Sequence, residues 1–437
     1  MNQLYSNHIG DLLKRHRQLM QNNDIENLII SSGTPIRVYQ DDMDYPFKSS
    51  FFFRTYVPLT ELPHSFIVIG LSGKPKLVYF QPVDFWHTPP ADPSGYWTEH
   101  FEIEVIKETK AAAELLPLDN QAVAILGEDS EILADYEKAQ KNPESLINAI
   151  YWQRAYKSDY EIECIKQANQ LAARAHNVAE KMFRAGKSEQ QIHLAYLESL
   201  GILEHQLPYG NIIALNANGA ILHYHDCQSK VPDKVRSFLI DAGASVAGYH
   251  SDITRTYAYE AGEFAELISA MDAVNLECIG EARVGAEYGD LHASAHRKIA
   301  RLIHDFNFVD MSVDALVETD ITSTFFPHGL GHLIGLQVHD VGGQFADETG
   351  AAKPPPAAYP FLRSTRTIES NMVYTVEPGF YFIDPLLAKQ KDGEYANAFN
   401  WDKIESFRPY GGIRIEDNIV IRESGVENLT RDAFSAL

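Results

Sequence analysis

Cysteine is scarce in this sequence. Three of the 437 residues are cysteines, Cys164, Cys227 and Cys278, and they lie far apart. An odd number of isolated cysteines fits neither a disulfide framework nor a zinc-binding motif, because both need matched spacings. We therefore predict three free thiols. Free thiols are typical of a reducing compartment, so we also predict a cytoplasmic protein.

The sequence also lacks long apolar segments. No run approaches the ~18 consecutive apolar residues that a membrane-spanning helix needs. The N-terminal segment contains Asp11, Lys14, Arg15 and Arg17 in place of the apolar core of a signal peptide. The sequence therefore predicts neither a membrane span nor a signal peptide.

Positive charge is the third deficit. Lysine and arginine number 37 against 60 aspartate and glutamate residues, which gives a formal net charge of −23. This balance argues against binding to nucleic acid, whose phosphate backbone requires basic surface. The remaining composition, 45% hydrophobic and 22% charged, is that of an ordinary globular protein with a sizeable core. The length indicates two or more domains.

The first part of the chain alternates between helical and strand-like patterns. Apolar residues at helical spacing occupy 4–22, and strand-like runs follow at 25–32, 65–70, 76–80, 102–105 and 123–126. Alternation of this kind predicts a small α/β domain, to which we assign residues 1–157. Inside it, the acidic and aromatic segment 41–47 is interpreted as a solvated turn.

Two capping boxes mark the start of the second part. Ser158 and Glu161 form the first box, and the helix after it is predicted to run to about residue 183. Ser188 and Gln191 form the second box, before a helix that ends near residue 200. Further helices are predicted over 263–282 and 290–305, interleaved with short strands. We assign residues 158–437 to an α+β domain.

A candidate hairpin over residues 238–257 contains two aspartates. If its turn is centred between Val246 and Ala247, Asp241 and Asp252 lie directly opposite each other, with Cβ atoms roughly 4.5–5.5 Å apart. Two carboxylates this close repel unless a proton or a cation lies between them. The spacing suits two divalent ions roughly 3.5–4 Å apart. The alternative is a pair of polar residues at the rim of a hairpin.

Three histidines occur within twelve positions: His328, His332 and His339. A proline and two glycines interrupt the segment 325–332, so the two histidines four apart do not lie on a helix as in the zinc proteases. Glycines allow the backbone to pass close to other groups, which leaves His332 free to act as a ligand. One histidine alone would be interpreted as a hydrogen-bonded core residue, whereas three favour a site. A strand is predicted to continue to residues 337–340.

Two further strands carry charged residues. The strand that begins at 371 is expected to stop at Pro378, which places Glu377 at its end. In the alternating segment 411–421, Arg414 and Glu416 share one side of a strand, about 6.6–6.8 Å apart. The alternative is an exposed Arg/Glu pair of little energetic value. Glycine pairs and an apolar run around the segment instead favour a central strand whose polar pair faces a cavity.

These observations select five candidate metal ligands: Asp241, Asp252, His332, Glu377 and Glu416. Four carboxylates and one imidazole form an oxygen-rich set that suits Mn²⁺, Co²⁺ or Fe²⁺. Four negative charges balance two divalent ions. A water that bridges two such ions can ionise near neutral pH and act as a nucleophile.

The order of these motifs resembles that of the pita-bread metallopeptidases. Within them the chain is most similar to the bacterial Xaa-Pro dipeptidases (prolidases), and in particular to the subgroup also called organophosphorus acid anhydrolases. The resemblance extends over essentially the whole chain and is carried by residues 40–47, 208–211, 221–224, 238–257, 323–343, 376–379 and 411–418. It implies an N-terminal α/β domain followed by an α+β pita-bread (creatinase/aminopeptidase-like) catalytic domain.

The resemblance also implies roles for individual residues. Asp241 and Asp252 would be the paired aspartate ligands, with Asp252 bridging two metals. His332 and Glu377 would hold the second metal, and Glu416 would be the other bridge. The metals of the family are usually Mn²⁺, with Co²⁺ as an alternative. No ligand position departs from the family pattern, so an active enzyme is expected.

Substrate-contacting residues are implied in the same way. The positions that match the family are His223, His328, His339, Arg414, Tyr209 and Asp42. Arg414 would meet the substrate carboxylate, and Tyr209 would wall the pocket. Asp42 would approach the site of a neighbouring subunit, which implies a homodimer. Glu377 would transfer the proton to the leaving nitrogen, and His339 and His223 would steady the tetrahedral intermediate and the carboxylate end of the substrate.

The predicted reaction is hydrolysis of Xaa-Pro dipeptides. Proline contributes a tertiary amide without N–H, so peptidases that require this donor fail and a dedicated site is needed. One rival is a metal-free creatinase-like hydrolase or a binding module on the same fold. Another is an aminopeptidase that acts on longer Xaa-Pro peptides. Hydrolysis of organophosphate triesters is expected as a secondary activity, because tetrahedral phosphorus resembles the peptide transition state.

Overall fold

The computed structural model describes residues 1–117, 122–128, 133, 136 and 138–437. The chain divides into two compact units. Unit 1 comprises residues 1–154, 158–161 and 347–351, and unit 2 comprises 155–157, 162–346 and 352–437. All three cysteines are free thiols, as predicted. Within the described residues, no helix is both long and apolar enough to cross a membrane.

Unit 1 is built on a six-stranded sheet in the order β4-β3-β2-β1-β5-β6. Its strands are β1 Asn27–Ser31, β2 Phe66–Gly70, β3 Lys76–Phe80, β4 Glu102–Ile106, β5 Val123–Leu126 and β6 Gln140–Lys141, and its helices are α1 Asn2–Asn22, α2 Phe51–Arg54, α3 Ala112–Leu115 and α5 Glu144–Arg154. Strand β1 is antiparallel to β2 and parallel to β5. The predicted α/β architecture of the first part is confirmed.

The helices that open the second part begin where their capping boxes predict. Helix α6 spans Asp159–Arg184, and Ser158 N donates to Glu161 Oε2 at 2.8 Å while Glu161 N donates to Ser158 Oγ at 3.4 Å. Helix α7 spans Glu189–Leu200, and Ser188 and Gln191 form the reciprocal bonds of the second box. Each box satisfies backbone N–H groups that the first turn of a helix leaves unpaired.

The remaining elements of unit 2 are short strands and packed helices. One sheet has the order β11-β8-β7, a second has the order β12-β15-β16, and β13 pairs with β14. The strands are β7 Ile212–Leu215, β8 Ser237–Asp241, β9 Ser245–Val246, β10 Tyr249–His250, β11 Thr254–Ala258, β12 Val373–Val376, β13 Gly379–Tyr381, β14 Gly412–Arg414, β15 Asp417–Arg422 and β16 Gly425–Asn428. The helices after α7 are α8 Glu263–Glu281, α9 Tyr288–Asp305, α10 Val313–Glu318, α11 Thr322–Phe325, α12 Asp384–Lys391, α13 Trp401–Phe407 and α14 Leu429–Ser435.

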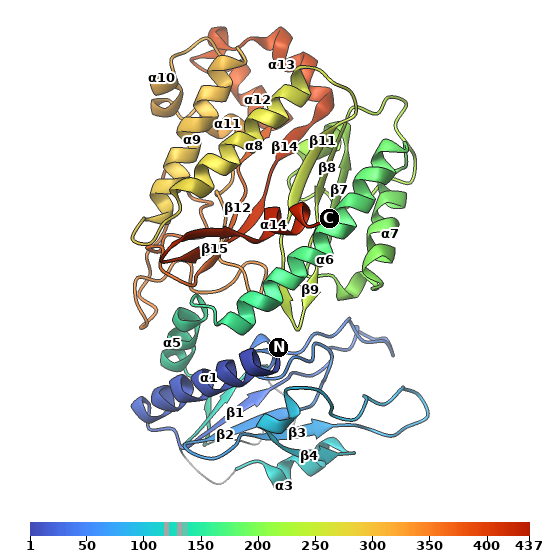
Figure 1. Cartoon of the computed structure of the whole chain (residues 1–437), viewed down its shortest axis with the longest axis vertical. Coiled ribbons are helices and arrows are strands. Elements are labelled where there is room, and N and C mark those ends of the chain that lie inside the picture. The colour runs from blue at the N-terminus through green and yellow to red at the C-terminus, as the bar shows by residue number, and fades with distance from the viewer. Residues whose placement is uncertain (118–121, 129–132, 134–135, 137) are drawn as a thin grey trace. The chain divides into compact units, whose positions relative to one another are not determined.

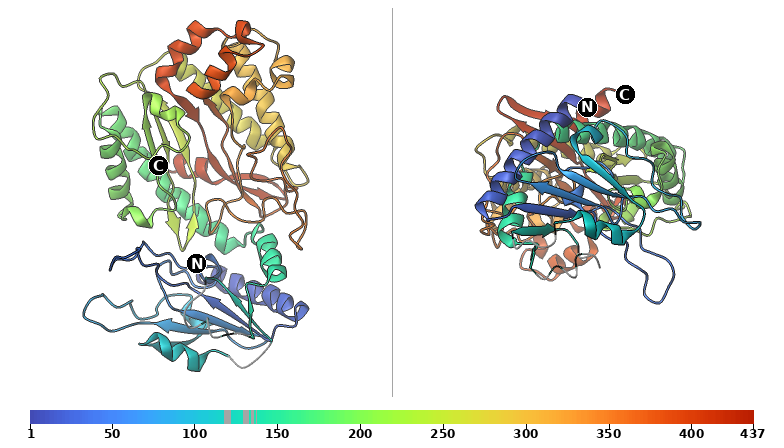
Figure 2. Two further views of the ribbon diagram at one scale, coloured as in Figure 1. Left: turned by 180° about the vertical axis from the view of Figure 1, so that it is seen from behind. Right: turned by 90° about the horizontal axis from the view of Figure 1, so that it is seen from below.

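Helices flank the strands of unit 2 on two sides. Helices α6 and α7 lie beside β7 and β8 (Figure 1), and their apolar side chains share one core cluster with those strands. On the other side α8 and α9 contribute to a larger apolar cluster with β12, β13 and β15. The reverse view shows the two groups of helices from behind (Figure 2). The strand ends between these two cores carry the polar residues of the candidate site. The predicted α+β architecture of the second part is confirmed.

The predicted register of the 238–257 hairpin is wrong. Asp241 is paired with Thr254, and Asp252 lies two residues before that partner. The turn is centred one residue later than expected, on Ala247 and Gly248, which have φ of 53° and 85°. Positive φ at both positions is what a two-residue hairpin turn requires, and glycine adopts it without steric cost.

Two further strand predictions are wrong in detail. Residues 337–340 form bends and not a strand, because the chain folds back on itself: Asp340 N donates to Leu333 O at 2.9 Å, and Asp340 is paired with buried Lys157 at 3.0 Å. The segment 411–421 forms two strands, β14 and β15, with Glu416 in the break between them. Pro378 does interrupt the chain after β12, but β13 begins at the next residue.

Candidate metal centre

Three of the predicted ligands converge in unit 2. One ligand atom from each of Asp252, His332 and Glu416 lies within 4.8 Å of the other two, and all three residues are buried. Asp252 precedes β11, His332 follows α11, and Glu416 lies between β14 and β15. Residues from three distant parts of the chain thus form one acidic cluster.

The other two predicted ligands border this cluster. His332 Nε2 lies 3.6 Å from Glu377 Oε1 and 3.5 Å from Asp252 Oδ2. The hydroxyl of Tyr209 lies 2.8 Å from Asp241 Oδ1 and 2.5 Å from Asp252 Oδ1. A phenol has a single proton, so it can donate to one of the two carboxylates only. The second contact brings two acceptors together, which requires a shared proton or a nearby cation.

His332 is oriented as a ligand by its own backbone. Its Nδ1 lies 3.0 Å from the Leu333 carbonyl, which is an acceptor, so Nδ1 carries a hydrogen and Nε2 is the ring nitrogen directed at the carboxylates. The backbone at His332 also exchanges bonds with Thr375, whose Oγ1 accepts from His332 N at 3.0 Å. Gly331 permits this approach, because a Cβ there would fall 2.2 Å from the Thr375 carbonyl.

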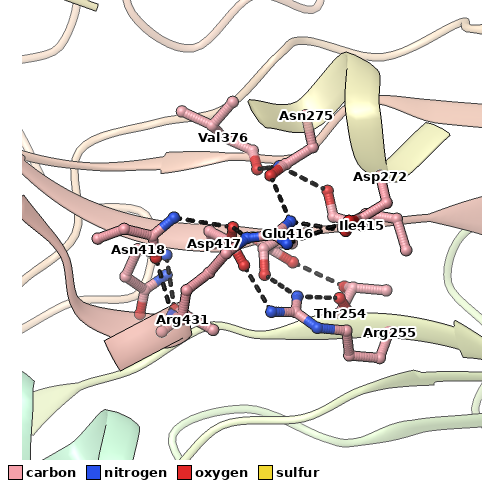
Figure 3. Close-up of polar contacts among 12 residues, drawn as sticks. Thr254, Arg255, Asp272, Asn275, Val376, Ile415, Glu416, Asp417, Asn418 and Arg431 are labelled. Carbon is pink, nitrogen blue, oxygen red and sulfur yellow. Dashed lines mark hydrogen bonds and ion pairs between the residues drawn. The ribbon is translucent and has the colours of Figure 1, made fainter. Parts of the chain in front are cut away.

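Glu416 and Asp252 are held by neighbours that the sequence patterns did not reveal. Thr254 Oγ1 donates to Glu416 Oε2 at 2.7 Å (Figure 3). Asn418 Oδ1 accepts from the backbone N of Asp252 at 3.0 Å, and its amide donates to the Asp252 carbonyl at 2.5 Å. Asp417, fully buried between them, accepts from Arg255 and Arg431 at 2.6 Å each. The three consecutive residues 416–418 therefore serve one site, and their direct adjacency to a predicted ligand was the available signal.

Burial, together with the neighbouring charges, shifts the pKa values of these carboxylates. Burial, with a smaller contribution from Asp252, raises the pKa of Asp241 to about 6 against the opposing charge of Arg414. Burial raises the pKa of Glu377 to about 7 and that of Glu416 well above its ordinary value. For Asp252, burial is outweighed by His332 and Tyr209, and its pKa is lowered. In His332 the contacts with Asp252 and Glu377 outweigh burial and raise the pKa.

Arg414 is buried beside this cluster, with 5% of its surface exposed. Its Nη2 donates to Asp241 Oδ2 at 2.6 Å, its Nε to Thr254 Oγ1 at 3.1 Å and its Nη1 to Tyr381 Oη at 2.9 Å. The alternative of an exposed Arg/Glu pair is thus excluded, since Glu416 is also buried. Sequence reasoning missed Tyr381, which carried no motif signal.

His328 continues the chain of hydrogen bonds from Arg414. Its Nδ1 donates to the Gly329 carbonyl at 2.9 Å, so its Nε2 accepts from the Tyr381 hydroxyl at 2.9 Å. Burial lowers the pKa of His328 to about 3, with Arg414 adding to the shift. The imidazole is therefore neutral at neutral pH and is ordered by its neighbours on both sides.

The structure places the other predicted site residues at different distances from the cluster. The ring of His339 packs edge-on against that of His332, with centroids 4.4 Å apart, and burial lowers its pKa to about 3. His223 is exposed on a loop, close enough to contribute electrostatically to the lowered pKa values of His328 and His339. Asp42 lies in unit 1, on an exposed hairpin between Arg37 and Asp44.

This residue set fits a pair of divalent cations. Four carboxylates with an oriented imidazole supply hard oxygen and nitrogen donors, and two doubly charged ions would cancel four negative charges. The Tyr209 hydroxyl between two carboxylates and the raised pKa values indicate a site whose negative charge is neutralised by protons or by cations. Such a centre is suited to metal-assisted hydrolysis.

Comparison with known proteins identifies the class. Residues 163–423, which contain every residue of the cluster, match the model of metallopeptidase family M24. Residues 3–152 match the N-terminal domain of Xaa-Pro dipeptidases. The fold and the site thus define a metallopeptidase with a pita-bread catalytic domain, as predicted.

Full-length relatives narrow the assignment. The chain is 47% identical to a protein of Pseudoalteromonas translucida over 430 residues (98% of each chain) and 46% identical to one of Aeromonas hydrophila over 433 residues (99% and 98%). Both relatives are named Xaa-Pro dipeptidase. The chain therefore belongs to metallopeptidase family M24 and, within it, to the Xaa-Pro dipeptidases.

Solved structures with the same fold are more distant in sequence. Aminopeptidase P of E. coli in complex with product, a zinc-substituted form, aligns with a TM-score of 0.73 at 22% identity over 96% of this chain and 94% of its own. Proline aminopeptidase P II of Yersinia pestis aligns with a TM-score of 0.71 at 22% identity, covering 99% of this chain and 97% of its own. These likenesses concern the fold alone.

Replacing Asp252 with Asn should lower metal content and reduce peptidase activity by more than about 100-fold. Mutating residues that merely orient metal ligands costs about 10–100-fold, and loss of a ligand itself should cost at least as much. The folded state should persist, because the Asn418 bonds use the backbone of residue 252. Metal analysis, thermal unfolding and peptide hydrolysis check this, with Asp233→Asn on the exposed surface as the matched control. A variant that binds two metal equivalents and retains normal turnover would contradict the assignment.

The metal-free protein should show a specific pH dependence at Glu377. Its folded-state pKa of about 7 lies above the ordinary value of 4.5, so between these pH values the folded state holds a proton that the unfolded chain has released. This contribution to stability is present below about pH 4.5 and is lost as pH rises to about 7. Buried neutral histidines such as His328 have the opposite effect: they make the stability of the fold increase as pH rises, because their pKa is lowered on folding.

The comparison is therefore made with Glu377→Gln, which cannot ionise. After chelation, the melting temperature of the unmodified protein relative to this variant should fall as pH rises from about 4.5 to about 7.5. This range covers the ordinary and the raised pKa of Glu377. Added Mn²⁺ should reverse that difference in favour of the unmodified protein. A relative melting temperature that rises with pH without metal would contradict the raised pKa.

Proposed function

We propose that this enzyme hydrolyses Xaa-Pro dipeptides with two divalent metal ions, of which Mn²⁺ is our first candidate and Co²⁺ the alternative. The observation that carries the proposal is the buried convergence of Asp252, His332 and Glu416 in a chain that matches Xaa-Pro dipeptidases over its full length. We propose residues 1–157 as the N-terminal domain and 158–437 as the catalytic domain. A metal-free creatinase-like activity is disfavoured because the five-ligand set is complete.

The metal-holding residues would be Asp241, Asp252, His332, Glu377 and Glu416. When bound, the two ions supply Lewis acidity and activate water. Glu377, at the edge of the cluster and partly exposed, is placed to pass a proton to the leaving proline nitrogen. Arg414 and Tyr381 hold Asp241 and His328 in fixed positions through the bonds described above.

The substrate would contact a ring of neutral and polar groups. His339 and His223 would steady the tetrahedral intermediate, because an imidazole N–H can donate a hydrogen bond to a developing oxyanion. His328 and Tyr209 would wall the pocket. Among the described residues, three of the five N–H groups of Arg414 have acceptors, so the guanidinium retains the donors to meet a substrate carboxylate.

The rival activity is that of an aminopeptidase on longer peptides. It is favoured by the fold, since the solved structures above are aminopeptidases P. The identity of 47% to Xaa-Pro dipeptidases against 22% to those structures favours the dipeptidase. Chain length of the substrate distinguishes the two.

Ala-Pro should be hydrolysed at least ~30-fold more efficiently than Ala-Pro-Ala. In the tripeptide an amide replaces the carboxylate of proline, so Arg414 keeps Asp241 but loses a charge-assisted hydrogen bond to the substrate worth about 2 kcal/mol, where each 1.36 kcal/mol is a factor of ten. The measurement is kcat/KM for both peptides with Mn²⁺ present. Comparable values would assign the enzyme to the aminopeptidases.

Replacing Arg414 with Lys should raise KM for Ala-Pro strongly, because lysine lacks the planar pair of donors that matches a carboxylate. We also propose a secondary phosphotriesterase activity. Hydrolysis of an uncharged triester should decrease less in Arg414→Lys, because such a substrate has no carboxylate for Arg414 to bind. Metal content must be measured in the same samples, since Arg414 also contacts Asp241. Equal losses on both substrates would mean that Arg414 acts only by supporting the metal ligands.

We further propose that the enzyme is a cytoplasmic homodimer in which Asp42 of one protomer closes the site of the other. Support comes from unit 1, where exposed apolar side chains gather around Asp42: Ile36, Tyr39, Met43 and Tyr45 are between 55% and 86% exposed. A second exposed loop presents Phe85 and Trp86, at 86% and 76%. Apolar tips of this kind are typical of surfaces that another chain covers.

Mixing two inactive variants tests this arrangement. Asp42→Ala would lack the closing residue in both sites, and Asp252→Asn would lack metal in both. After unfolding and refolding together, heterodimers should regain Ala-Pro hydrolysis at one site, where Asp42 comes from the Asp252→Asn protomer. Sedimentation should show a dimer. A mixture no more active than the sum of its parts would contradict the shared site.

A further inference from the structure

The loop that carries His223 has no regular structure of its own. Residues 221–236, all of which are described, connect a 3₁₀ turn at Asn216–Ala220 to β8 without a helix or strand. His223 itself is exposed. A segment like this needs anchors from outside if it is to hold a side chain at a fixed place.

Glu189 supplies such anchors. It lies in the first turn of α7 and only 1% of its surface is exposed. Its Oε1 accepts from Leu215 N at 2.7 Å and from the Asn218 amide at 2.8 Å. Its Oε2 accepts from the Tyr224 hydroxyl at 2.6 Å and from Gln228 N at 2.7 Å. One buried carboxylate thus collects four donors, which fills its acceptor capacity.

The four donors lie on both sides of His223 in the sequence. Asn218 lies before it, Tyr224 directly follows it, and Gln228 ends the segment, where its carbonyl also accepts from Gln190 N at 3.1 Å. The anchored segment therefore cannot shift without breaking bonds to a buried charge, which is costly.

Packing fixes the direction in which the loop lies. Tyr224 is 4% exposed and forms a small apolar cluster with Ile212, Ala214 and Leu239. Leu239 and Asp241 are two residues apart on β8, so their side chains share one face of the sheet. Tyr224 thus attaches the loop to the face that carries a predicted metal ligand.

We propose that Glu189 is a positioning residue for substrate binding: through Tyr224 and Gln228 it holds His223 beside the metal centre. This inference rests on the proposed function, because His223 is assigned to the substrate there. A glutamine of the same shape could not replace Glu189, since its amide nitrogen would face two donors where the carboxylate has an acceptor.

The test compares four variants with the unmodified enzyme: Glu189→Gln, Tyr224→Phe, His223→Ala and the double variant Glu189→Gln/His223→Ala. Glu198→Gln, an exposed position on the same helix, is the control and should behave like the unmodified enzyme. Glu189→Gln should lower kcat/KM for Ala-Pro by about 10-fold or more, because misplacing a group that contacts the substrate by 1 Å can cost ~100-fold. Metal content should stay unchanged.

The double variant separates positioning from general destabilisation. If Glu189 acts through His223, adding Glu189→Gln to His223→Ala should change kcat/KM by less than about 2-fold, since coupled residues are not additive. Fully additive losses would overturn the proposal. Tyr224→Phe removes one hydroxyl and keeps the ring, so it gives the same test, with a smaller loss, if Glu189→Gln folds poorly.

Hydrogen exchange of the 221–228 amides gives a readout that needs no substrate. Exchange there should accelerate in Glu189→Gln and in Tyr224→Phe but not in Glu198→Gln. Unchanged exchange would overturn the proposal even if the enzyme is a dipeptidase. Accelerated exchange in an enzyme that does not cleave Ala-Pro would instead refute the proposed function and leave the anchoring of the loop in place.

Discussion

The constraint on which this structure depends is the repulsion among four buried carboxylates. Asp241, Asp252, Glu377 and Glu416 lie close together with little exposure to water, and the pKa of three of them is raised, first by burial and then by the neighbouring carboxylates. Arg414 and His332 offset only part of this charge. Protons or cations must neutralise carboxylates in such a site, and an oxygen-rich ligand set with this much negative charge favours divalent cations.

Holding such a site together requires support that is itself fully bonded. Asn418 fixes the backbone of Asp252 from β15, and Asp417 beside it is neutralised by two arginines. Gly331 allows the chain before His332 to touch β12. Each of these contacts joins segments distant in sequence, so ligands that lie where strands begin, end or break are still held in place.

The histidines around the centre are placed by two different means. His328 lies at the end of a buried chain of bonds from Arg414 through Tyr381, whereas His223 depends on a loop attached to Glu189. The pita-bread fold is shared with aminopeptidases P, so the fold does not decide the length of peptide accepted. That choice depends on the loops and side chains around the metals, where one fold can support different specificities.

The sequence by itself determined the local elements and the kinds of residue at the site. Capping boxes at Ser158 and Ser188 set helix starts, and the motif order pointed to Asp252, His332 and Glu416 as ligands, because caps, periodicity and motifs are read within a few residues. Only the tertiary structure decided the hairpin register, the fold-back at Asp340, the pairing of Arg414 with Asp241 and the roles of Tyr381, Asn418 and Glu189. These depend on a turn shifted by one residue and on hydrogen bonds between distant segments, which leave no trace in the local pattern.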